Sequence, residues 1–187
     1  QNSGLDRLLT GFNWGNGFMA EHEIGYQFTS DIDRERLLSH SGYWRIPLPY
    51  QHTLSITGGY STTKAPINQD LNSSGATLQL GLRYIVPLPN FEGYRHQANL
   101  GIDYKETDNN LEFGGEEIFR SKIHIAQVAL SYLAQESDPW GSTYFSINGL
   151  FSPSGVTYLN QGDAFAVARQ GAQARYEYGD ATVERSW

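Results

Sequence analysis

Apolar and polar residues alternate along this chain in unusually long runs. A period of two places successive side chains on opposite faces of an extended strand. A tilted strand that crosses a bilayer needs about 9 to 11 residues, whereas strands of soluble proteins usually have about 5 to 6. The runs therefore predict the wall of a transmembrane β-barrel. In the clearest run, one face carries Phe18, Ala20, His22, Ile24, Tyr26 and Phe28, and the other carries Met19, Glu21, Glu23, Gly25, Gln27 and Thr29.

The pattern predicts nine strands and the beginning of a tenth near Thr182. Short connections, such as WGNG (14–17) and PLPNFEG (87–93), are expected to alternate strictly with long polar ones, such as KAPINQDLNSSG (64–75) and TDNNLEFGGEEIFR (107–120). This asymmetry is typical of outer-membrane barrels, which have short periplasmic turns and long exterior loops. The nine predicted strands cover residues 5–14, 17–29, 37–48, 53–63, 76–88, 97–106, 122–134, 142–152 and 166–179.

The alternation also assigns the two faces of the predicted sheet. Leucines alternate with polar residues in the fifth and sixth strands, so we expect the leucines to meet lipid and the charges to face the lumen, where water solvates them. His22 lies on the apolar side and fits only near a membrane interface. Aromatic residues gather near predicted strand ends, as in interfacial girdles; among them are Trp14, Tyr43, Trp44, Tyr60, Tyr84, Tyr104 and Tyr132. The predicted lumen-lining residues are Glu21, Glu23, Arg45, Arg83, Asp103, Lys105, Arg175 and Glu177.

Composition excludes several classes of function. The 187 residues carry a net charge of -7, so a basic surface for nucleic acid is not expected. The chain has no cysteine, and its five histidines lack ligand-like spacing, so no metal or cofactor is expected. Asp31, Asp33 and Glu35 resemble the start of a calcium loop, but Arg36 stands where that loop needs glycine. No nucleophile elbow or phosphate-binding loop is present, so no catalytic residue and no enzyme activity are predicted.

Two segments of the chain resemble each other and suggest a repeated hairpin. Tyr43 leads through IPLPYQ to HTLSITGGY, and Tyr84 leads through VPLPNFEG to HQANLGIDY. In both copies a histidine precedes a tyrosine by eight residues, as His52 precedes Tyr60 and His96 precedes Tyr104. Each copy is interpreted as a strand, a proline-containing turn and a returning strand, with proline at strand ends where no ladder hydrogen bond is lost. Coincidental similarity between two strand pairs is the alternative.

Three stretches resemble the barrel of the haemolysin-activator family, the outer-membrane transporters of two-partner secretion in the Omp85 superfamily. They are SGLDRLLTGFNWGNGFMAEHEIGYQFT, HSGYWRIPLPYQHTLSITGGYS and DAFAVARQGAQARYEY. The resemblance implies an all-β, antiparallel transmembrane β-barrel of 16 strands, preceded by periplasmic POTRA domains that receive an unfolded exoprotein. Residues 1–187 would then form an incomplete barrel domain of about nine or ten strands, without POTRA domains, a signal peptide or the family's VRGY-type motif.

The predicted function is a protein-conducting pore in the bacterial outer membrane that secretes or activates a partner exoprotein. Its partners would be that exoprotein, reached through POTRA domains outside this chain, and outer-membrane lipid. Two alternatives remain at this stage. The first is an outer-membrane assembly factor or passive porin, and the second is a soluble β-sandwich that binds carbohydrate through exposed tryptophan and tyrosine.

Overall fold

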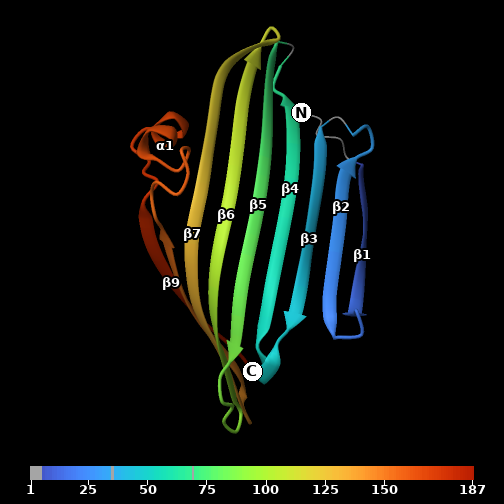
Figure 1. Ribbon diagram of the computed structural model, residues 1–187, viewed down its shortest axis with the longest axis vertical. Coiled ribbons are helices and arrows are strands. Elements are labelled where there is room, and N and C mark those ends of the chain that lie inside the picture. The colour runs from blue at the N-terminus through green and yellow to red at the C-terminus, as the bar shows by residue number, and fades with distance from the viewer. Residues whose placement is uncertain (1–5, 35, 69) are drawn as a thin grey trace.

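A computed structural model describes residues 6–34, 36–68 and 70–187, and its strands form one open antiparallel sheet (Figure 1). Each strand pairs with its neighbours in sequence, in the order β1 to β9. This confirms the predicted all-β class. The strands are β1 (Arg7–Gly17), β2 (His22–Asp31), β3 (Leu37–Pro47), β4 (Thr53–Pro66), β5 (Leu71–Pro87), β6 (Tyr94–Phe113), β7 (Glu116–Asp138), β8 (Gly141–Ser152) and β9 (Tyr176–Ser186), with a 3-10 turn at Pro49–Gln51 and a helix, α1, at Gly162–Ala168.

The expected long loops are mostly strand, so the strict alternation of loop lengths is wrong. β4 continues to Pro66 and β6 to Phe113, and β6 and β7 are 20 and 23 residues long. The apolar alternation stops before these strands end, but polar side chains continue the pairing. Arg120, for example, forms an ion pair with Asp108 across β6 and β7. In Figure 1 the resulting hairpins rise at the upper end of the sheet, which carries the β2–β3, β4–β5 and β6–β7 connections.

The turn between β1 and β2 comes later than the predicted WGNG turn. β1 runs to Gly17 with an irregular register after Trp14, and β2 begins at His22. Phe18 and Glu21 have positive φ angles of 58° and 57°, and the Glu21 amide donates to the Asn16 side chain. Residues 18–21 therefore form a turn, and the alternation that begins at Phe18 belongs to a strand only from His22 onward.

The predicted strand over 166–179 is also wrong. Its first residues belong to the helix Gly162–Ala168, and the strand begins only at Tyr176, so the expected tenth strand is part of β9. Alanine has the highest helix propensity, which explains a helix in this alanine-rich stretch. Phe165 on α1 is buried, and α1 lies beside the upper half of β7 (Figure 1).

The pairing register gives the sheet two faces of opposite character. On the polar face, one paired row crosses β1 to β7 through Asn13, Gly25, Tyr43, Thr57, Gly81, Asp103 and Gln127, and Ser152 pairs with Tyr176 across β8 and β9. On the apolar face, the neighbouring row contains Trp14, Ile24, Trp44, Ile56, Leu82, Ile102, Val128 and Phe151.

The apolar face is uncovered in the part of the chain that the structure describes. Leu100 and Leu130 are 53% and 62% exposed, and the buried apolar residues are three alanines and Phe165. Because the described strands make a single layer, the β-sandwich alternative is wrong. Among the described residues, no helix combines the length and hydrophobicity needed to cross a membrane.

Candidate functional site

The polar face contains a hollow of about 700 Å³ across the middle of the sheet. Strands β1 to β7 all contribute to its lining. Most side chains there are amides, hydroxyls or charged groups, and glycines keep the surface low. The hollow is therefore wide and shallow, with polar side chains from several strands along its surface. Its polar lining includes Gln27, Ser41, Thr57, Gln79, Asp103 and Lys105.

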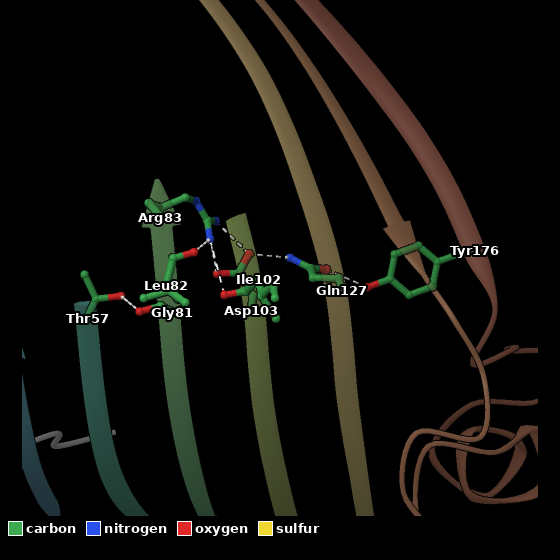
Figure 2. A network of polar contacts seen from close by, with 8 residues as sticks. All are labelled: Thr57, Gly81, Leu82, Arg83, Ile102, Asp103, Gln127 and Tyr176. Carbon is green, nitrogen blue, oxygen red and sulfur yellow. Dashed lines mark hydrogen bonds and ion pairs between the residues drawn. The ribbon is translucent and has the colours of Figure 1, made fainter. Parts of the chain in front are cut away.

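A chain of hydrogen bonds crosses this face from β5 to β9 (Figure 2). The Arg83 guanidinium donates from both Nη atoms to the two carboxylate oxygens of Asp103, each at 2.7 Å. The Gln127 side-chain amide donates to the same carboxylate at 3.1 Å, and its carbonyl oxygen accepts from the Tyr176 hydroxyl at 2.9 Å. A two-pronged ion pair is more directional than a single contact. The network therefore fixes the positions of opposite charges on the polar face.

Two glycines make room for this network. A Cβ atom on Gly101 would lie 2.4 Å from Arg83 Nη1 and 2.5 Å from its Cδ, so the arginine side chain lies directly over the glycine. A Cβ on Gly81 would lie 2.5 Å from the Thr57 hydroxyl, which bonds to the Gly81 carbonyl. Glycine inside a strand often marks such a close approach. Positions 81 and 101 therefore require glycine, because the side chains of Thr57 and Arg83 occupy the space that a Cβ atom would need.

The substitution Gly101→Val is expected to destabilise the fold by about 1 kcal/mol, because the new side chain displaces Arg83 from Asp103 and both groups are partly exposed. The matched control is Gly149→Val on the apolar face, where the nearest atom to a Cβ is 4.0 Å away. Chemical unfolding of the full-length protein from lipid vesicles measures both variants. Equal stability of the two variants would contradict the predicted role of Gly101.

A second charged group lies on the same face nearer the first strands. Glu23 accepts from the Tyr43 hydroxyl at 2.7 Å and from Arg45 at 2.8 Å. The Tyr43 ring covers Gly25, where a Cβ would lie 2.2 Å from the ring. Tyr43 therefore belongs to the polar face, and its expected place in an interfacial girdle is wrong.

The structure brings together most of the predicted lumen-lining residues, but not all of them. Glu23, Arg45, Arg83, Asp103 and Lys105 share the polar face. The other three do not join them on a strand: Glu21 lies in the β1–β2 turn, Arg175 precedes β9, and Glu177 pairs with Phe151 on the apolar face near the start of β9.

The sequence did not predict two members of the hydrogen-bond network, Gln127 and Tyr176. Gln127 carries no charge and is not among the predicted lumen-lining residues, although it lies on the polar side of a clearly alternating run. The strand predicted over 166–179 puts Arg175 and Glu177 toward the lumen and hence Tyr176 on the opposite face, which is the wrong register for β9. The hydrogen bond of Tyr176 to Gln127 shows that Tyr176 faces the polar side. Among the described residues, no cluster of three metal-ligating side chains is present.

The comparisons with known proteins support the fold. No protein-family model matches the sequence, and no curated protein matches it. Among solved structures, the chain is similar to CdiB from Escherichia coli, with a TM-score of 0.76 and 10% identity. The likeness covers 96% of this chain and 33% of CdiB, so the chain spans about a third of that protein's length. The chain therefore has the fold of an open part of a β-barrel wall.

Proposed function

We propose that the chain forms part of the wall of a protein-conducting pore in the bacterial outer membrane, of the two-partner secretion type. The observation that carries this proposal is the single-layer sheet with one uncovered apolar face and one polar face. In a membrane barrel, lipid covers the apolar face and water fills the lumen. The polar face with its hollow is then the inner surface of the pore.

Two likenesses support this class of pore. The sequence resembles the haemolysin-activator barrels in three stretches, and the fold likeness to CdiB supports a barrel of the type found in two-partner secretion transporters. Under this proposal the partner is an unfolded exoprotein, and the function is transport rather than catalysis.

The charges of the polar face suit the passage of an extended polypeptide. Arg83 is neutralised by Asp103, and Arg45 by Glu23, while Lys105 adds a further cation. A wall of mixed sign does not hold a passing chain by a single strong field, and polar side chains keep it wet. A segment of either charge can therefore move along the wall without being trapped.

Charge reversal at the central pair tests this role. In planar bilayers, full-length protein with Asp103→Arg is expected to shift its reversal potential toward anion selectivity, and Arg83→Glu toward cation selectivity. Both variants should secrete the exoprotein several-fold less well, since each leaves two like charges side by side on the wall. Lys64→Glu, at the exposed upper end of β4, is the control and should leave both properties unchanged.

The outcomes separate the proposed pore from its alternatives. Unaltered conductance and secretion in both variants would show that this face does not line the pore. Altered conductance without any secretion of an exoprotein by the parent protein would instead identify a passive porin.

A further inference from the structure

All five histidines of the chain lie on the apolar face, near its two borders. His40 and His124 lie toward the upper end of the sheet. The other three lie near the lower end of the sheet: His22 begins β2, His52 immediately precedes β4, and His96 is the third residue of β6. We refer to His22, His52 and His96 as the lower histidine rim. Each residue of this rim is partly exposed.

Each histidine of the lower rim pairs with an aromatic residue on the next strand. His22 Nδ1 accepts from the Trp44 indole at 3.2 Å, and the ring centroids are 5.7 Å apart. His96 Nδ1 contacts the Tyr132 hydroxyl at 2.9 Å, with centroids 5.8 Å apart. His52 Nδ1 contacts the Tyr84 hydroxyl in the same way, with a 5.4 Å centroid separation. The lower rim is therefore one structural unit repeated three times.

This pairing determines which ring nitrogen carries the proton. The indole nitrogen of Trp44 is a donor without acceptor capacity, so Nδ1 of His22 must accept, and the proton of the neutral ring lies on Nε2. A tyrosine hydroxyl in the donor role has the same effect at His52. Trp44 therefore leaves an Nε2–H donor at His22, and Tyr84 leaves one at His52 when its hydroxyl donates.

The three histidines differ in whether the protein supplies a hydrogen-bond acceptor for Nε2. His96 Nε2 lies 3.0 Å from the Pro89 carbonyl oxygen, within the same turn. For His22 and His52, the described residues supply no hydrogen-bond acceptor for Nε2. A buried or membrane-facing N–H without an acceptor is costly, so an acceptor from outside the described residues is required at these two positions.

The position of the lower rim indicates which acceptor is within reach. Toward the middle of the sheet the apolar face continues through Leu54, Ile56 and Leu100, which suit hydrocarbon. Beyond the lower rim, charges begin again with the ion pair between Asp138 and Arg185. In a membrane barrel, histidines at such a border with amphipathic aromatic partners would lie at the level of the lipid headgroups.

We propose that His22 and His52 bind phospholipid phosphate groups through Nε2–H, while His96 does not because its Nε2–H already donates a hydrogen bond to the Pro89 carbonyl. This inference rests on the proposed membrane function. Lipid phosphate offers charged oxygens at the required depth, and a hydrogen bond to a charged acceptor is stronger than one to water. The two histidine–aromatic pairs would thus fix the depth of this part of the barrel in the leaflet.

Solid-state NMR tests the contact directly. Full-length protein with ¹⁵N-labelled histidine is inserted into vesicles of phosphatidylethanolamine and phosphatidylglycerol in phosphate-free buffer, and ¹⁵N–³¹P dipolar dephasing is measured. Strong dephasing is expected for Nε2 of His22 and His52, and clearly weaker dephasing for His96. His22→Phe, His52→Phe and His96→Phe assign the signals. Trp44→Phe removes the donor to His22 and should give a mixture of its two tautomers with reduced dephasing.

Each outcome bears on the proposal separately from the pore function. Inserted, conducting protein without dephasing at His22 and His52, or with equal dephasing at His96, overturns the headgroup site and leaves the pore intact. Dephasing that also occurs in maltoside micelles with inorganic phosphate identifies a free-phosphate site and overturns the lipid assignment. Protein that fails to insert into vesicles overturns both proposals.

Discussion

Replacing Leu100 by arginine is expected to destabilise the membrane-inserted protein by about 2 to 4 kcal/mol. Leu100 lies midway between His96 and Tyr104 on the apolar face of β6 and is 53% exposed. If lipid covers this face, the guanidinium must lose its water near the middle of the bilayer. The measurement is the free energy of unfolding in urea for full-length protein folded into lipid vesicles.

The neighbouring position provides the matched control. Asn99 lies on the polar face of the same strand and pairs with Ile85 and Ser131. An Asn99→Arg variant places the same charge in a hydrated region, so its free energy of unfolding should change by less than about 1 kcal/mol. If the two arginine variants are equally stable, the apolar face is not in contact with lipid.

The second large effect concerns the segment 153–175, which covers the upper part of β7. β8 pairs with β7 only from Val128 onward. Beyond this point the amide of His124 donates to the Leu159 carbonyl, and the fully buried Asn160 side chain donates to the His124 carbonyl at 2.9 Å. Ser152 similarly donates to the Ala126 carbonyl. The segment thus satisfies backbone groups of β7 that β8 leaves unpaired.

The substitution Asn160→Ala is expected to lower the free energy of local opening of the segment 153–175 by about 2 kcal/mol, because it leaves the buried His124 carbonyl without its donor. Local opening should then make amide hydrogen exchange at His124 about 30-fold faster, while global stability changes less. Exchange measured by mass spectrometry or NMR on the inserted protein detects this difference.

Gln161→Ala is the control for the cover, because Gln161 is exposed and its side chain makes no capping hydrogen bond to α1. Exchange at His124 should stay close to that of the parent protein in this variant. An unchanged exchange rate in Asn160→Ala would show that the segment is held in place by other contacts, such as the buried Phe165.

Residues whose alternation is strong could be placed from the sequence alone. Leu100 and Asp103 lie on the expected opposite faces of β6, because a period of two has one solution where one face is apolar. The repeated hairpin is also present: β3 and β4 are joined through a proline-containing turn, as are β5 and β6, with His52 just before β4 and His96 near the start of β6. His22 lies at the start of β2, near the border of the apolar face. The sequence pattern predicts that a histidine on this face fits only near such a border.

The errors arise where apolar alternation stops being informative. The upper parts of β6 and β7 mix polar and apolar residues without a clear alternation, so they carry no period-two signal. The prediction puts Glu177 on the lumen face because it extends one alternating strand from residues that belong to α1. A shift of one residue in the register exchanges the two faces, and Glu177 lies on the apolar face. The close contact between Gly101 and Arg83 depends on cross-strand register, which neither strand reveals by itself. The domain assignment of residues 1–187 stays a prediction.

The most direct test of lipid contact is a single-cysteine scan of β6 from residue 97 to residue 104 in full-length, vesicle-inserted protein. The natural chain has no cysteine, so each spin label reports one site. Accessibility to oxygen and to a water-soluble nickel complex is measured by electron paramagnetic resonance. The proposed fold predicts high oxygen and low nickel accessibility at Ala98, Leu100 and Ile102, with the reverse at Asn99 and Asp103. High nickel accessibility at all positions would contradict the proposed fold in the membrane. Protection of the apolar face from both oxygen and nickel would contradict it as well.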